Sequence, residues 1–331
     1  MRRRRSRLPR RIALVALVAL SVLGASRGAG AQSGIASEGA LDFILPTGAR
    51  VLGMGQAAAA SASGTEALWW NPAGIARSPR ELSLGFVSNV LLPKTDLSLA
   101  FVYPIPGVMS VALSLRYLNT GEQESTVDPN GQVGTFVNRD NVVTATFAAP
   151  FGDRLAVGVN LKVLTVSFDC TGQCSTPPGK PLTGALDLGG RYLVTKDSSL
   201  SLGLSVRNVG LPLQINDSPQ ADPLPGRADV GVEFAPRLAQ YPDARVRVAA
   251  DVVTRLSGEG TPGFRIGGEL SWLGQYHGRV GYVVDGPTGS GPSFGAGVSR
   301  GRWRADFAQF VSDLGAESGQ KPTYFTLRYV F

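Results

Sequence analysis

The chain has 331 residues, of which 43% are hydrophobic and 17% are charged, and its formal net charge is +7. Eight of its 32 basic residues are arginines within residues 1–31, so residues 32–331 carry 24 basic and 25 acidic residues. The basic excess therefore belongs to the first 31 residues. It gives no support to nucleic-acid binding, for which no basic stripe with interleaved aromatic residues appears elsewhere.

The first 31 residues have the layout of a secretory signal peptide. Residues 1–11 carry seven arginines, residues 12–23 are apolar apart from Ser21, and Ala29-Gly30-Ala31 offers small residues for cleavage. We predict that the mature chain starts at Gln32. The apolar run is shorter than the roughly 20 residues of a spanning helix, and a retained anchor is the alternative. No cysteine lies near the cleavage site, which argues against a lipoprotein.

Residues 32–80 do not alternate as strands do. Residues 52–60 are rich in Gly and Ala, which allow close backbone packing, and residues 65–70 predict a short helix that ends before Pro72. We predict that residues 32–80 form a compact plug inside a barrel, with Trp69 and Trp70 anchoring it against the wall.

Residues 81–331 break into segments of alternating apolar and polar residues, separated by Gly, Pro, Asn and Asp. This pattern is typical of strands with one apolar face. No run of 18 apolar residues follows the signal peptide, so a chain in lipid could span it only as a closed barrel. We predict fourteen strands, near 81–90, 95–104, 108–119, 136–149, 154–168, 181–195, 199–208, 225–235, 244–256, 261–273, 276–284, 292–300, 302–311 and 322–331.

The predicted connections alternate in length, as they do in outer-membrane barrels. The turns on one side are short, apart from a longer one at 236–243. The loops on the other side are mostly longer and include 120–135 and 209–224. The chain is thus predicted to be an all-β, antiparallel up-and-down transmembrane barrel of about fourteen strands. It would lie in the bacterial outer membrane, with its N- and C-termini in the periplasm. A soluble β-sandwich is the alternative.

The period of two assigns polar residues to the lumen, where charges would pair. A Lys or Arg on the lipid face would cost about 2–4 kcal/mol at the midplane. Aromatic residues near strand ends, among them Tyr103, Tyr192, Trp272, Tyr324 and Tyr329, predict an interfacial girdle. The predicted lumen-facing residues are Arg116, Asn160, Lys162, Asp187, Arg191, Arg207, Arg247, Asp251, Arg265, Glu269, Arg304, Asp306 and Arg328.

The two cysteines, Cys170 and Cys174, are close enough to staple a hairpin tip, and an exported protein can form disulfides. Free thiols and a metal site are the alternatives. A C-x3-C pair without a second ligand pair is a weak metal signal, so we predict no metal and no cofactor.

The chain ends on Phe331, which closes a strand that alternates Phe325, Leu327, Tyr329 and Phe331 with Thr326 and Arg328. A terminal strand of this kind resembles the signal that the barrel-assembly machinery recognises. That machinery and outer-membrane lipid are therefore predicted partners.

Two motifs give the chain a family resemblance. The first motif is Gly48–Gly55, which ends in Gly53, Met54 and Gly55, and the second is Trp70-Asn71-Pro72-Ala73-Gly74. Together they resemble the N-terminal signature of PorV/PorQ proteins, within the wider FadL-like superfamily of outer-membrane barrels. The likeness extends through residues 153–162, 185–189, 206–210 and 221–225. It implies a fourteen-stranded barrel with an N-terminal plug. The Ala run after Gln56 and the single acid in Ser63–Glu66 depart from the family pattern.

The resemblance implies a function without catalysis. The first hypothesis is an accessory subunit of a type IX-like secretion system, with a translocon subunit as partner. The alternative is a FadL-like channel for hydrophobic molecules, and a barrel with no transport role is the third. Enzyme signals are weak: Gly53–Ala58 fits G-x-G-x-x-A but lacks a preceding strand. The single histidine, His277, has no G-x-S-x-G motif beside it.

Overall fold

The structure is a computed structural model, and it describes residues 38–89, 94–126, 133–172, 180–214, 221–257, 261–286, 289–311 and 322–331. All of them belong to one compact unit, Ala36–Phe331. The predicted signal peptide lies outside the described residues.

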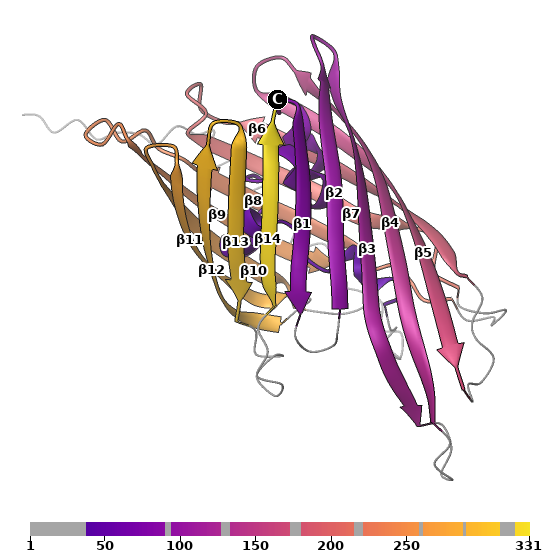
Figure 1. Cartoon of the computed structure of the whole chain (residues 1–331). Coiled ribbons are helices and arrows are strands. Elements are labelled where there is room, and N and C mark those ends of the chain that lie inside the picture. The colour runs from indigo at the N-terminus through magenta and orange to yellow at the C-terminus, as the bar shows by residue number, and fades with distance from the viewer. Residues whose placement is uncertain are drawn as a thin grey trace, which may run out of the picture. The chain divides into compact units, whose positions relative to one another are not determined.

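Fourteen strands form one closed barrel (Figure 1), and this confirms the predicted fold class. Each strand pairs antiparallel with the next, and β14 pairs with β1 to close the ring. The strands are β1 Glu81–Asn89, β2 Lys94–Ile105, β3 Met109–Thr126, β4 Val133–Phe151, β5 Leu155–Thr171, β6 Leu182–Leu193, β7 Leu200–Gly210, β8 Arg227–Phe234, β9 Ala244–Arg255, β10 Gly263–Trp272, β11 Tyr276–Gly286, β12 Gly289–Arg300, β13 Trp303–Phe310 and β14 Thr323–Val330.

The barrel is apolar outside and polar inside, the reverse of a soluble protein. On β10, Phe264, Ile266 and Leu270 are each more than half exposed, whereas Arg265 and Glu269 are at most 5% exposed. Hydrocarbon favours such an apolar outer face, and the alternating inward residues are then free to be charged. Tyr324 departs from its predicted girdle position, because it faces the lumen and is buried.

Among the described residues, no helix combines the length and the apolar composition needed to cross a membrane.

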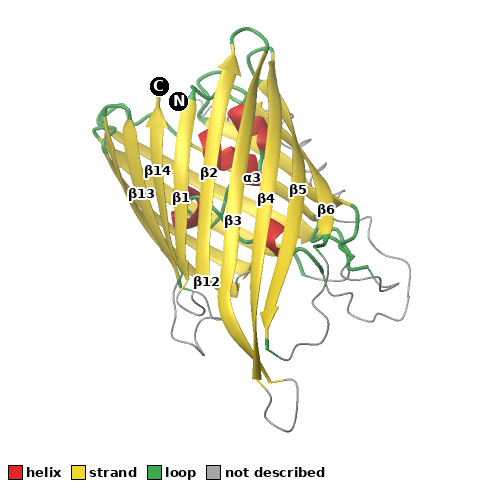
Figure 2. Cartoon of the chain, turned by 45° about the vertical axis from the view of Figure 1, so that its right-hand side comes forward, coloured by secondary structure: helices red, strands yellow, loops and turns green. Residues whose placement is uncertain are grey.

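Strands β3, β4 and β5 are longer than the rest and project beyond the barrel at one end (Figure 2). They span 18, 19 and 17 residues. The sequence predicts a loop over 120–135, but β3 continues to Thr126 and β4 begins at Val133. The extension was missed because residues 120–126 are almost all polar, so that no apolar alternation marks them as strand.

The segment before β1 runs through the lumen from one rim to the other. Near one rim, Gly39 N–H donates to the Pro223 carbonyl (2.9 Å), which lies between β7 and β8; at the other, Phe331 N–H donates to the Arg80 carbonyl (3.0 Å). Short helices lie between (Figure 2): η1 Leu41–Phe43, α2 Ala49–Gly53, η2 Gly64–Glu66, α3 Ala67–Trp70 and η3 Pro72–Ile75. The two ends of the barrel therefore meet at one rim. That this rim is periplasmic stays a prediction.

Deleting Phe331 is expected to lower the amount of folded barrel in the outer membrane. The residue supplies a hydrogen bond to Arg80, and its ring packs edge-on against Tyr329 at 4.9 Å between ring centroids. The hydrogen bond joins the end of β14 to the start of β1, and the ring contact holds the terminal residue against β14. Heat-modifiable migration of membrane fractions measures the folded amount. Normal amounts of a deletion variant that lacks function would contradict an assembly role.

Candidate functional site: the plugged lumen

Two adjacent tryptophans anchor the plug, and each lies between two cations of the wall. The Trp69 ring centroid is 4.8 Å from the Arg116 guanidinium carbon and 5.0 Å from Lys162 Nζ. The Trp70 ring centroid is 5.3 Å and 5.4 Å from the guanidinium carbons of Arg207 and Arg265. Cation–π attraction strengthens when both groups are desolvated, so these contacts fix α3 in the lumen.

The cations around the tryptophans are themselves paired with wall carboxylates. Lys162 Nζ lies 2.6 Å from Asp187, Arg116 Nη2 lies 2.5 Å from Asp96, and Arg207 Nε lies 2.9 Å from Asp229. Buried charges need such partners. The charge pairs therefore hold the cations in place against the plug.

A second group of charges surrounds the plug residue Arg50 of α2. Its guanidinium pairs with Glu269 at 3.3 Å and donates to the Ser61 carbonyl at 3.2 Å. Glu269 also accepts ion pairs from Arg279 at 2.6 Å and from Arg304 at 3.3 Å. Two further carboxylates belong to this network. Asp306 pairs with Arg328 at 2.7 Å, and Glu233 pairs with both Arg191 and Arg247.

Two side chains fix the backbone of the plug where it turns. Asp251 Oδ2 accepts hydrogen bonds from the amides of Ala58 (2.6 Å) and Ala59 (2.8 Å). Asn71 Nδ2 donates to the Ala59 carbonyl (2.6 Å), and its Oδ1 accepts from Ala73 N–H (3.1 Å). This geometry explains the Asn-Pro-Ala motif: the asparagine caps η3, and Pro72 at its start lacks the N–H that would stay unpaired.

Lumen-facing glycines lie where the plug backbone touches the wall. A Cβ on Gly281 would lie 2.1 Å from Gly55 N, and one on Gly267 would lie 2.1 Å from the Met54 carbonyl oxygen. Backbone therefore rests on backbone at Gly53–Gly55, as the small residues of this segment predict. A dinucleotide site is not built here, because strands and not a phosphate-binding helix surround the glycines.

The structure places all thirteen sequence-predicted lumen residues on the inner face. Arg247 is the most exposed of them, with 38% of its side chain accessible. Sequence reasoning missed Asp96, Asp229, Glu233 and Arg279, although the alternation within their strands marks each of them as inward-facing. It also missed Arg50 and Asn208. Arg50 lies in the plug, where no period applies, and Asn208 lies at a register irregularity between β6 and β7, with φ 60°.

Near the rim where Gly39 lies, a cluster of apolar side chains from the plug and the wall fills part of the lumen. Phe43 is fully buried in one apolar cluster with Trp69. Lys162 Nζ lies 5.7 Å from the Phe43 ring centroid, and Asn208 donates to the Phe43 carbonyl at 3.3 Å. The cluster also contains Val142, Leu164, Val166, Leu213 and Leu224.

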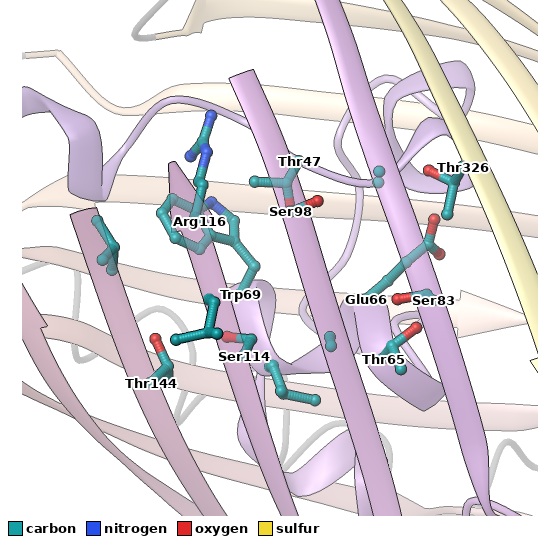
Figure 3. A pocket seen from close by; sticks show the side chains of 16 residues that line it. Thr47, Thr65, Glu66, Trp69, Ser83, Ser98, Ser114, Arg116, Thr144 and Thr326 are labelled. Carbon is teal, nitrogen blue, oxygen red and sulfur yellow. The ribbon is translucent and has the colours of Figure 1, made fainter. Parts of the chain in front are cut away.

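A cavity of about 40 Å³ lies between the plug and β1–β4 (Figure 3). Ser83, Ser98 and Ser114 line it from three adjacent strands, opposite Glu66 and Trp69 of the plug. Such a volume holds a few water molecules, whereas an engineered cavity that binds benzene measures about 150 Å³. The cavity is too small for a hydrocarbon of this size.

The end of the plug near Gly39 is held by Glu38, which pairs with Arg227 at 2.7 Å and accepts from Ser257 Oγ at 3.0 Å. Burial raises the pKa of Glu38, but the Arg227 guanidinium outweighs it and the pKa lies below its usual range. A lowered pKa means that the contact is complete at neutral pH and is lost as the pH falls through that lowered value. We expect residues 38–43 to become accessible to protease only when the pH falls below the usual range of a glutamate pKa, measured by cleavage in detergent micelles. Glu38→Gln should remove this pH dependence.

Other predicted features can be placed only in part. Cys170 is disulfide-bonded, but Cys174 lies outside the described residues, so their pairing stays a prediction. The His277 ring nitrogens lie 2.8 Å from Ser271 Oγ and 2.9 Å from Ser299 Oγ. Within the described ranges, no group of three His, Cys, Asp or Glu residues is placed to hold a metal.

No model of a known protein family and no curated protein matches the sequence. Solved structures match its fold. The Pseudomonas putida toluene transporter TodX superposes with a TM-score of 0.62 at 12% identity, covering 87% of this chain and 99% of that one. The monoaromatic hydrocarbon channel CymD gives 0.58 at 12%, covering 87% and 98%. A Pseudomonas aeruginosa FadL homologue gives 0.52 at 13%, covering 87% and 99%. Identities this low establish a shared fold alone. No family match supports the PorV/PorQ assignment.

Proposed function

We propose that the chain is a plugged outer-membrane channel that passes small hydrophobic molecules without catalysing a reaction. The observation that supports it most is the end-to-end match to barrels described as toluene and monoaromatic hydrocarbon channels. The apolar cluster around Phe43 is the region of the lumen where such a molecule would be stable. The match therefore favours the FadL-like channel over the accessory subunit of a secretion system.

The described conformation is closed, so passage requires part of the plug to move. Every neighbouring pair of strands is bonded, and the hydroxyl-lined cavity is too small for a solute. Within the described ranges, the register of the wall is irregular at three places, between β3 and β4, β6 and β7, and β11 and β12. Residues 38–44 fill the apolar region and are the segment whose movement would vacate it.

Uptake of radiolabelled toluene by cells with an intact outer membrane tests the proposal. Cells that make the chain should accumulate toluene faster than cells that carry the empty vector. Equal rates at matched amounts of folded barrel would overturn the proposal. Affinity capture of the barrel from native membranes tests the secretion hypothesis separately, since recovery of a large translocon subunit would support that hypothesis instead.

Phe43→Ala is expected to turn the apolar region into a binding site for one aromatic ring. The change removes a fully buried phenyl group, costs about 3–5 kcal/mol of stability, and leaves a space among apolar side chains. Dry cavities of this kind bind benzene. Toluene should therefore raise the unfolding temperature of the variant more than that of the wild type in detergent micelles. Phe264→Ala, on the exposed outer face, is the matched control, and an equal response of both variants would contradict an apolar lumen site.

A further inference from the structure

The outer surface of the barrel carries an arginine held among aromatic rings where the barrel closes. The Arg80 guanidinium carbon lies 4.2 Å from the Phe331 ring centroid, 5.5 Å from that of Phe101 and 5.8 Å from that of Tyr103. Arg80 precedes β1, and the rings belong to β2 and to the residue that follows β14. The cluster thus spans the seam that closes the barrel.

The aromatic row continues to a second arginine. The Phe331 and Tyr329 ring centroids are 4.9 Å apart, those of Tyr329 and Trp303 are 4.7 Å apart, and Arg302 Nη1 donates to the Tyr329 hydroxyl at 3.4 Å. Arg302 is exposed in the turn before β13. Two guanidinium groups therefore flank one row of rings on the outer face of the same rim.

Among the residues that the structure describes, neither arginine has an anionic partner. The ion pairs among the described residues all lie elsewhere, and the terminal carboxylate of Phe331 pairs with neither Arg80 nor Arg302. This differs from the lumen, where most arginines face a carboxylate. Leu82 and Leu84 continue the same outer face toward the middle of the barrel, so the row lies where the apolar belt ends.

We propose that Arg80 and Arg302 bind the phosphate of an anionic phospholipid at this seam. The rings cover a face of the Arg80 guanidinium, which leaves its N–H edge for an anion, and guanidinium donors match phosphate oxygens in two-pronged contacts. Aromatic rings prefer the headgroup level of a bilayer, where basic residues attract anionic lipids. The bound lipid would bridge β13, β14, β1 and β2 and clasp the closing seam. The site lies on the outer surface and does not depend on transport through the lumen.

Native mass spectrometry with dioleoyl-phosphatidylglycerol tests the site. The wild-type barrel should retain at least one more of these lipids than Arg80→Gln/Arg302→Gln, and phosphatidylglycerol should raise its unfolding temperature more than that of the double variant. Arg154→Gln/Lys196→Gln removes two cations from turns at the same rim and should behave as the wild type. Heat-modifiable migration confirms that each variant is folded.

Three results would overturn the proposal. Equal lipid retention by the Arg80/Arg302 variant and the wild type would remove the site. If the Arg154/Lys196 control variant lost as much bound lipid, the binding would come from the general positive charge of the rim and not from a specific site. Displacement of phosphatidylglycerol by a lower concentration of lipid A would assign the phosphate to a different lipid. Toluene uptake is measured in the same variants, so that a failure of the lipid site is distinguished from a failure of the channel.

Discussion

Gly281→Ala is expected to unseat the plug while the barrel stays folded. The new Cβ would lie 2.1 Å from Gly55 N and 2.5 Å from Gly55 Cα. Both atoms belong to backbone, so no side chain can rotate away, and one of the two chains must shift. Overpacking of this kind costs about 1–3 kcal/mol, which changes the ratio of seated to unseated plug by a factor of about five to over a hundred.

Strand β11 has room for an alanine at another glycine, Gly278. A Cβ on Gly278, on the same strand and facing outward, would meet nothing within 4 Å. Gly278→Ala is therefore the matched control. Ionic conductance in planar bilayers measures whether the lumen has opened. Gly281→Ala should conduct ions, and both Gly278→Ala and the wild type should show almost no conductance. A closed Gly281→Ala barrel would show that the plug does not rest on this glycine.

Much of the wall could be predicted because each of its residues obeys a local rule. Hydrocarbon outside and a polar lumen inside impose a strict period of two, and Phe264, Arg265 and Ile266 show it within three consecutive residues. Gly, Pro and Asn then mark the turns. The same rule fails where the strand leaves the membrane, as in residues 120–126 of β3, since neither face has to be apolar there.

The plug could be located from the sequence but its contacts could not. Arg50 and Glu269 are 219 residues apart, and no local pattern relates them. Asn208 adopts φ 60° at an irregular register, so the period of two shifts at that point. Such contacts depend on which strands become neighbours when the ring closes and on how the plug threads it. These are properties of the whole barrel.

Glu269→Ala is expected to cause the largest loss of stability among single changes of charged lumen residues. The carboxylate is 4% exposed and pairs with Arg50 and Arg279, which are buried, and with Arg304. Asp306 remains as a partner for Arg279 and Arg304. Within the described residues, the Arg50 guanidinium then keeps only its hydrogen bond to the Ser61 carbonyl, at 3.2 Å. Removing one partner of a buried ion pair costs about 3–5 kcal/mol, because the other charge stays buried without compensation.

The loss should come from the orphaned arginine and not from the missing carboxylate alone. Replacing both partners with apolar residues of similar volume is often neutral, since no buried charge is left over. Arg50→Met/Glu269→Met should therefore recover part of the loss, whereas Glu122→Ala, on the exposed face of the β3 extension, should change stability by less than about 0.5 kcal/mol. Urea unfolding in detergent micelles gives the free energies. If the double variant is as unstable as Glu269→Ala, then Arg279 and Arg304, not Arg50, are the arginines that need Glu269, and the plug is held mainly by its glycine and tryptophan contacts.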